Sequence, residues 1–107
     1  YLKSDVGTGS MSFQQAAASV YDTVYGGTSG YSEGLNVPFN IASRHGSTFI
    51  NGATEGAALT ANTTPVALPD LSAANFLIGK TFQGNIGKIR VWADDLGDTG
   101  IAEASTP

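Results

Sequence analysis

Residues 39–59 read FNIASRHGSTFINGATEGAAL, and this stretch decides the fold class of the chain. Phe39 and Ile41 alternate with polar or small residues, which is the period-two pattern of a half-buried β-strand. His45-Gly46-Ser47 predicts a turn after this strand, because glycine and small polar residues favour tight turns. Thr48-Phe49-Ile50 is β-branched and aromatic, and it predicts a second short strand.

Asn51-Gly52 follows this second strand. Asn-Gly is the strongest short hairpin signal, because a type I′ turn needs two residues that tolerate positive φ. The sequence therefore predicts a hairpin that turns at Asn51-Gly52 and returns along Ala53 to Leu59.

The chain before this stretch also favours strands over helices. Tyr1 to Val6 predicts one strand, and Ser19 to Tyr25, with its valines and tyrosines, predicts another. Met11 to Val20 is ambiguous, because its alanine triplet favours a helical turn while its first half alternates like a strand. Gly26 to Gly34 carries four glycines in nine positions, which predicts a loop.

The chain after this stretch continues the same pattern. Thr60 to Ala74 contains two prolines and predicts a loop. Asn75 to Thr81 and Gly84 to Ala93 each predict a strand from their apolar residues. Asp98 is placed to cap one closing helical turn over Thr99 to Ala104.

The predicted core collects the apolar members of these segments. It consists of Phe39, Ile41, Phe49, Phe76, Ile78, Ile86, Ile89, Val91 and Ile101. If the position of Ile89 is fully buried, truncation to alanine is expected to cost about 2–5 kcal/mol of stability.

Size and composition agree with a single all-β domain. The chain has 107 residues, of which 41% are hydrophobic, 13% are charged and 14 are glycine. This content is too apolar for disorder and too interrupted by glycine for long helices. Short strands joined by tight turns fit it best.

Charge and cysteine content exclude several classes of partner and site. The net charge is -4 and the five basic residues are spread singly, so the clustered cations that bind nucleic acid are missing. The chain has no cysteine, which excludes disulfides and thiolate metal sites. No apolar run approaches the roughly 18 residues of a membrane span, so membrane insertion is not expected.

Four short motifs follow one another from Phe39 to Ala104. They are Phe39-Asn40-Ile41-Ala42 with His45-Gly46, then Phe49-Ile50-Asn51-Gly52, then Phe76-Leu77-Ile78-Gly79, then Phe82-Gln83-Gly84-Asn85-Ile86 through Ile89-Arg90-Val91-Trp92 with a closing Leu96-Gly97-Asp98 and Ile101. In order and spacing they resemble the C-terminal half of a laminin-G-like domain, whose strands read "H-x-V-A…D-G", "Y-V-N-G", "L-x-I-G" and "F-x-G-x-I-D-E-V-R-I-Y". The small-residue loops are similar to those of such domains in bacteriophage tail, fibre and head-decoration proteins.

The resemblance implies an antiparallel, concanavalin-A-like jelly-roll β-sandwich with a short C-terminal helical turn. Residues 1–107 would form a single domain, with opening strands and a glycine-rich loop in 1–37 and the family-like half in 38–107. A complete jelly roll is longer, so we expect a fragment that lacks the first strands. The acidic pair of the family is Gly87-Lys88 here, so any role of those acids is lost. No set of calcium ligands can be placed, and no metal or cofactor is expected.

Candidate catalytic residues are few, and their structural roles are the better interpretation. His45 is the single histidine and lies in a predicted turn, where a turn or rim role is favoured. Jelly-roll glucanases place acids at alternate strand positions so that acid and nucleophile lie about 5–5.5 Å apart. Asp94 and Asp95 are consecutive, so on a strand they would point to opposite faces, and with Asp98 they fit a solvated turn. No catalytic residue is predicted.

Three tyrosines are the candidate binding residues. Tyr21, Tyr25 and Tyr31 combine an apolar ring with a polar hydroxyl, which suits stacking on sugars. The alternative is that Tyr21 and Tyr25 lie in the core or at a subunit contact, and the sequence favours that alternative. Trp92 is expected to pack in the core or on a sheet face.

The expected function is non-enzymatic adhesion at a virion surface, in a tail fibre or a decorated particle, through host-surface glycans. The competing class is a structural oligomerisation module without a ligand, and a weaker third class is an accessory domain of a secreted hydrolase. Expected partners are other virion proteins and further copies of the chain. A sandwich without its first strands leaves an unpaired sheet edge that favours an oligomer, with a trimer preferred by the resemblance.

Overall fold

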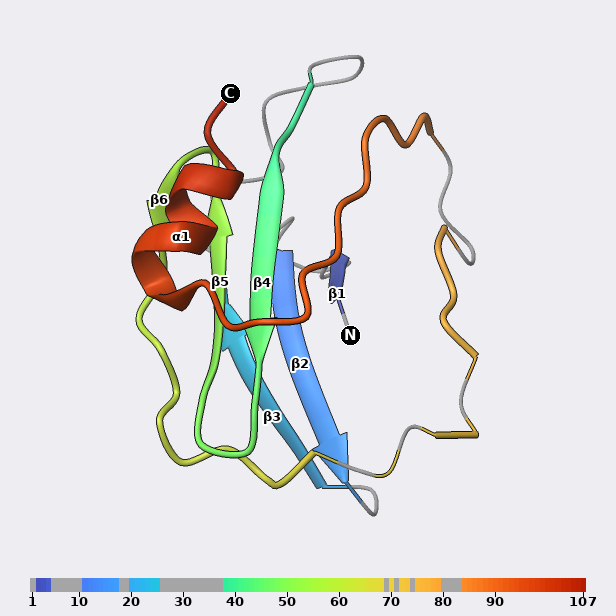
Figure 1. Cartoon of the computed structure of the whole chain (residues 1–107), viewed down its shortest axis with the longest axis vertical. Coiled ribbons are helices and arrows are strands. Elements are labelled where there is room, and N and C mark those ends of the chain that lie inside the picture. The colour runs from blue at the N-terminus through green and yellow to red at the C-terminus, as the bar shows by residue number, and fades with distance from the viewer. Residues whose placement is uncertain are drawn as a thin grey trace.

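The structure is a computed structural model, and it describes residues 2–4, 11–17, 20–25, 38–68, 70, 72–73, 75–79 and 84–107. These residues form two three-stranded antiparallel sheets and one short helix (Figure 1). The predicted sheet-rich, antiparallel fold with a closing helical turn is confirmed at this level. The elements in chain order are β1 (Leu2–Ser4), β2 (Met11–Ala17), β3 (Val20–Tyr25), β4 (Ile41–His45), β5 (Ile50–Thr54), β6 (Ala57–Ala58) and α1 (Gly97–Ala104).

The first sheet has the order β1-β2-β3. Its central strand β2 resolves the ambiguity of residues 11–20 in favour of a strand, and the strand expected over 19–25 is present as β3. Phe13 of β2 pairs with Leu2 on one side and with Val24 on the other. The loop expected over 26–34 lies outside the described residues.

The second sheet has the order β4-β5-β6. The predicted turn at His45-Gly46-Ser47 is confirmed, since β4 ends at His45 and the Gly46 N–H donates to the Phe49 carbonyl at 2.9 Å. The hairpin turn expected at Asn51-Gly52 is wrong, because both residues lie inside β5.

The chain instead reverses four residues later, between β5 and β6. Glu55 and Gly56 there have φ values of 49° and 86°, the positive pair that a type I′ turn requires. The return strand is therefore Ala57–Ala58 rather than Ala53 to Leu59. Residues 60–68 form no strand, as predicted, although Asn62 makes an isolated antiparallel bridge with Ile50.

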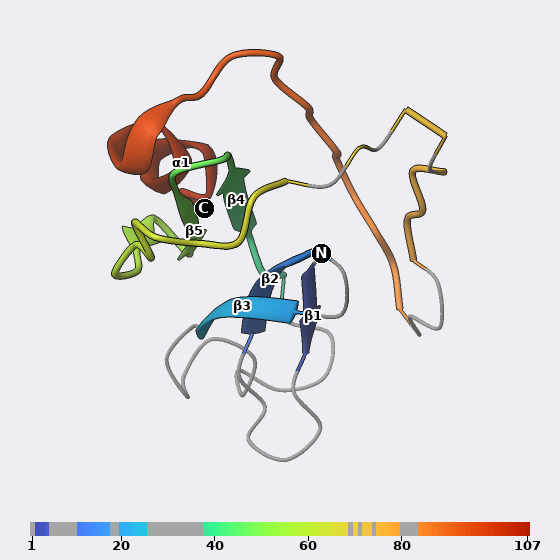
Figure 2. The same cartoon turned by 90° about the horizontal axis from the view of Figure 1, so that it is seen from below.

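The two sheets and the helix form three layers, with β4-β5-β6 in the middle (Figure 2). Because β5 is covered on both sides, its first four residues are all buried. Ile50 packs with Phe13 of the first sheet, and Phe39, Ile41 and Leu59 surround this pair. The expected inward position of Phe39 and Ile41 is thus confirmed.

Gly52 is buried under the Phe13 ring, which explains why a glycine stands in the middle of a strand. A Cβ atom at Gly52 would come within 2.5 Å of Phe13 Cγ, far inside van der Waals contact. The two sheets approach each other here because position 52 has no side chain. The glycine therefore serves packing between layers and not a turn.

Helix α1 covers the other side of β4 and β5. Ile101 is its buried apolar residue, 2% exposed, as predicted. The predicted N-cap is wrong, because the helix begins at Gly97, its N-cap is Leu96, and no side chain caps it. The carboxylate of Asp98 instead points to side chains of β4 and β5.

The strands predicted over 75–81 and 84–93 are not formed in their described parts. The apolar side chains of this region are exposed, with Phe76 at 75% and Val91 at 74%. Alternation of apolar residues produces a buried strand only where a neighbouring strand and an opposing layer exist, and here the described structure supplies neither. The five core positions predicted there are wrong, namely Phe76, Ile78, Ile86, Ile89 and Val91. The buried pair of Phe13 and Ile50 takes their place.

Candidate functional site

The tyrosines expected to bind sugars lie partly within the described structure. Tyr21 and Tyr25 are residues of β3, where they pair in register with Ala16 and Ser12 of β2. The two positions are four apart on one strand, so they share one face of the sheet. Tyr31 lies outside the described residues. The expectation of glycan binding therefore stays a prediction.

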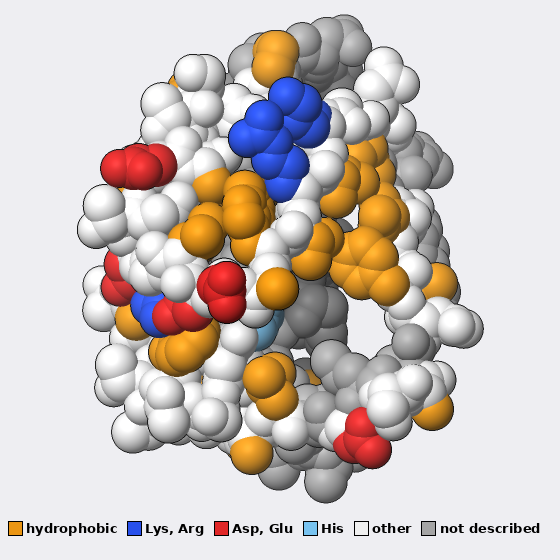
Figure 3. Space-filling view, in the orientation of Figure 1, with side chains coloured by type: hydrophobic (Ala, Val, Ile, Leu, Met, Phe, Trp, Pro, Cys, Tyr) orange, Lys and Arg blue, Asp and Glu red, His pale blue; other side chains and the backbone are white. Residues whose placement is uncertain are grey.

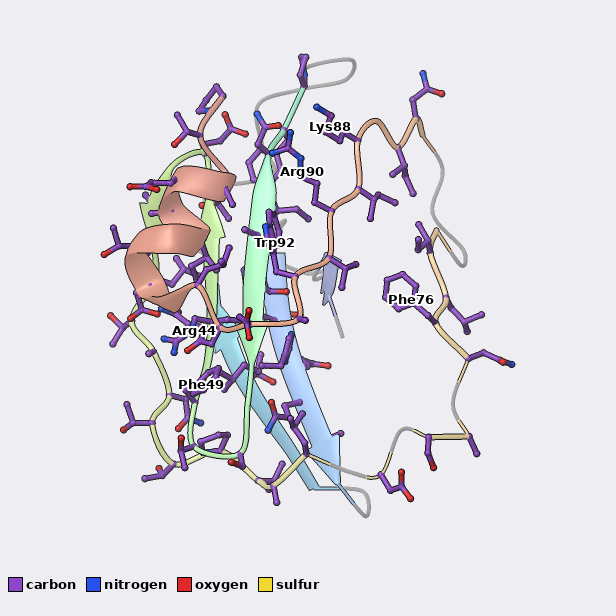
Figure 4. All side chains as sticks on the ribbon, viewed as in Figure 1. Arg44, Phe49, Phe76, Lys88, Arg90 and Trp92 are labelled. Atoms are coloured by element: carbon purple, nitrogen blue, oxygen red, sulfur yellow. The ribbon has the colours of Figure 1, made fainter. Side chains whose placement is uncertain are left out.

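A group of polar side chains joined by hydrogen bonds surrounds Arg44 of β4 (Figure 4). Its Nε donates to Asp95 Oδ1 at 2.8 Å and its Nη2 to Asp95 Oδ2 at 2.6 Å, a bidentate pair. Its Nη1 donates to Asp98 Oδ1 at 2.8 Å. The guanidinium carbon also lies 3.9 Å from the centre of the Phe49 ring, so a cation–π contact supports the same orientation.

Asn51 completes this group from the neighbouring strand. Arg44 and Asn51 are opposite each other in register, so both side chains are on the α1 side of the sheet. Asn51 Nδ2 donates to Asp98 Oδ1 at 2.9 Å and to the Leu59 carbonyl at 2.9 Å. We call Arg44, Phe49, Asn51, Asp95 and Asp98 the Arg44 cluster.

The electrostatics of the Arg44 cluster favour the charged forms of its members. The pKa of Asp95 is lowered by the hydrogen bond from Arg44 and by the Gly97 N–H, which donates to Asp95 Oδ1 at 3.0 Å. The pKa of Asp98 is lowered first by the Asn51 amide and then by Arg44. The pKa of Arg44 is raised mainly by its hydrogen bond with Asp95.

The Arg44 cluster connects α1 to the sheet, because Asp98 of the helix is bonded to Arg44 of β4 and Asn51 of β5. Both carboxylates are held as anions, so neither is suited to give up a proton near neutral pH. Asp94 and Asp95 are exposed just before the helix, in agreement with the solvated turn expected there. What the sequence did not show is that Asp95 and Asp98 are ion-paired with Arg44, 51 and 54 positions earlier in the chain.

His45 is half-buried at the end of β4, opposite Ile50 in register. Burial lowers the pKa of its imidazole to about 4, because the charged form would lose its hydration. The ring is therefore neutral at physiological pH. The rim or turn interpretation of His45 agrees with its place beside the Gly46 turn.

The surface also carries large apolar side chains that are exposed. Residues 75–92, which we call the 75–92 segment, carry most of the large exposed hydrophobic side chains (Figure 3). Trp92 is 46% exposed, so the packed position expected for it is wrong. Lys88 and Arg90 lie close together beside this surface, and the described part of the segment has no acidic residue (Figure 4). The exposed residues are Phe76, Leu77, Ile78, Ile86, Ile89, Val91 and Trp92.

Among the residues that the structure describes, no group of three or more histidine, cysteine, aspartate or glutamate side chains is arranged to hold a metal ion. None of the helical residues that the structure describes makes a helix of the length and apolarity required to cross a membrane.

The Arg44 cluster was missed at the sequence level. The available signal was a single arginine on a half-buried strand together with aspartates three residues apart before a helix. Those residues lie 51 and 54 positions from Arg44, so only the fold shows that they meet.

Comparisons with protein-family models, with curated proteins and with solved structures found no match to this chain.

Proposed function

We propose that this chain is a non-enzymatic adhesion and assembly domain on the surface of a virus particle, in a bacteriophage tail fibre or a decorated head. The observation that carries the proposal is the exposed apolar surface of the 75–92 segment. Large apolar side chains that are exposed together on one segment are typical of a place where another molecule binds. Contact with a partner, and not turnover of a substrate, is the function that this surface serves.

The polar residues support a binding role over catalysis. The single imidazole, that of His45, is neutral and half-buried, with its pKa lowered to about 4 by burial. Asp95 and Asp98 are committed to Arg44. Glycosidic hydrolysis needs one carboxyl group with a raised pKa as the acid, whereas both of these pKa values are lowered.

We infer that the two antiparallel sheets are the two layers of a concanavalin-A-like jelly-roll sandwich. The motif resemblance of residues 39–104 supports this inference, and so does the stacking of Phe13 of one sheet on Ile50 and Gly52 of the other.

Within the adhesion role, we propose host-surface glycans as the ligand of Tyr21, Tyr25 and Tyr31. The support is that the first two tyrosines occupy positions four apart on β3, and positions four apart share one face of a sheet. This spacing is about 13 Å along a strand, which is enough to span two sugar rings. A domain that only assembles the particle and has no ligand is the second candidate, because the exposed 75–92 segment supports contact with a partner without any role for the tyrosines.

Titration calorimetry against purified envelope polysaccharides tests the adhesion role. We expect weak binding that Tyr21→Ala and Tyr25→Ala reduce, with no release of reducing sugar. Lys3→Ala, on β1 of the same sheet, is the matched control and should leave binding unchanged. Hydrolysis of the polysaccharide by the pure chain would overturn the non-enzymatic proposal. The absence of binding to any polysaccharide would leave the assembly role as the function.

A further inference from the structure

The 75–92 segment has the composition of a strand but lacks the pairing of one. Within the described part of the chain, no backbone hydrogen bond joins residues 84–92 to another segment. Ile86, Ile89 and Val91 are nevertheless strand-forming residues, and all three side chains are exposed. Apolar, strand-forming side chains on a stretch that has no strand pairing among the described residues are typical of a peptide that adds to the edge of a sheet.

The charge distribution indicates that the partner of this segment is another copy of the chain. The 75–92 segment contains Lys80, Lys88 and Arg90 and no acidic residue, so it carries a charge of +3. The other residues carry nine acids and two bases, a charge of −7. The segment is thus complementary to the remainder of its own sequence. Two such segments paired with each other would oppose like charges, so a head-to-tail contact is favoured.

Open sheet edges are present to receive the segment. Among the described strands, β1, β3, β4 and β6 each pair on one side only. An unpaired edge is a template for a further strand from another chain.

We propose that residues 84–92 of one copy add as a β-strand to the acidic body of a second copy of this chain. A head-to-tail contact of this kind closes into a ring when the rotation between copies allows it. This proposal rests on the assembly part of the proposed function and names its partner and its segment.

Sedimentation velocity and light scattering on the full chain across the micromolar range test the proposal. We expect the wild type to form a single oligomer that weakens as salt is added, because salt screens the charge complementarity. Val91→Asp should raise the dissociation constant at least about tenfold, since it places an acid in the apolar contact. Lys88→Glu with Arg90→Glu should weaken association by a similar factor.

Leu68→Asp is the matched control, because Leu68 is also exposed but lies outside the segment. It should leave the oligomer intact, and circular dichroism should show that each variant keeps its fold. A wild type that stays monomeric across this range overturns the proposal, as does an oligomer that survives Val91→Asp. A monomer that still binds polysaccharide would overturn this inference alone, whereas an oligomer that binds none would leave it standing and remove the glycan role.

Discussion

The β4-β5 hairpin and the 75–92 segment both contain isoleucines, small residues and an arginine, but their structures differ. In the first region Ile50 is 0% exposed, because a sheet covers one side of it and a helix lies beyond. In the second, Ile89 and Val91 face solvent. The difference shows that apolar alternation favours a strand. The strand forms only where a neighbouring strand pairs with it and another layer covers its apolar side chains.

The largest expected effect comes from the contact between the two sheets. Phe13→Ala should cost about 3–5 kcal/mol in chemical denaturation, because a fully buried aromatic ring is lost. Gly52→Ala should cost about 1–3 kcal/mol, because its methyl group would overlap the ring.

The double variant of Phe13 and Gly52 sharpens this test. Removing the ring frees the space that the new methyl group needs, so the two losses should add to less than their sum. Full additivity would mean that the two positions do not touch.

The pH dependence of stability should report the burial of His45. Its folded pKa of about 4 lies below the ordinary 6.5, so the unfolded state binds more protons between these values. Stability is therefore full above pH 6.5 and falls as the pH drops toward 4. The slope should stay below the one-proton limit of about 1.4 kcal/mol per pH unit, because the unfolded and folded states differ by less than one bound proton at every pH in this window. In thermal unfolding, His45→Gln should remove this slope, and a slope that survives the change would assign it to another group.

Disruption of the Arg44 cluster should have a smaller effect on the free energy of unfolding. Arg44→Ala should cost about 1 kcal/mol, because the arginine loses a partly exposed pair with Asp98 and its contact with Phe49. By NMR titration, the pKa of Asp95 should move up toward its ordinary value. The pKa of Asp98 should move up less, because the Asn51 amide remains its first partner.

The sign of the acid effect follows from the lowered aspartate pKa values. Their contribution to stability is present above the unfolded pKa near 3.8 and is lost as the pH falls through the lower folded values. Arg44→Ala should therefore flatten the stability profile below pH 4. An unchanged profile in that range would show that the ion pairs do not form in solution.

The smallest effect on the folded monomer is expected in the 75–92 segment. Ile89→Ala should change the stability of the separated chain by less than about 0.5 kcal/mol, because the side chain is already exposed. Denaturation at decreasing concentration isolates this value from any effect of association. A loss of 2 kcal/mol or more would show that Ile89 is buried within its own chain, as the sequence pattern alone predicts, and would erase the contrast between the two regions.

Part of the candidate site could be read from residues that are near one another in the chain. The strand of Tyr21 and Tyr25, the turn at Gly46 and the burial of Ile101 all follow from local composition and spacing. The Arg44 cluster could not be predicted in this way, because its aspartates come from a segment about 50 residues later.

The sequence by itself determined the sheet-rich class, the turn at Gly46 and the place of the final helix, since propensity and alternation act over a few neighbouring residues. Only the tertiary structure decided whether the chain reverses at Asn51-Gly52 or at Glu55-Gly56. Asn51-Gly52 has the better turn signal, yet Phe13, 39 residues earlier, packs on Gly52 and leaves the reversal to Glu55-Gly56. The same reason explains the 75–92 segment, because burial depends on surfaces brought from far along the chain, and no local pattern contains them.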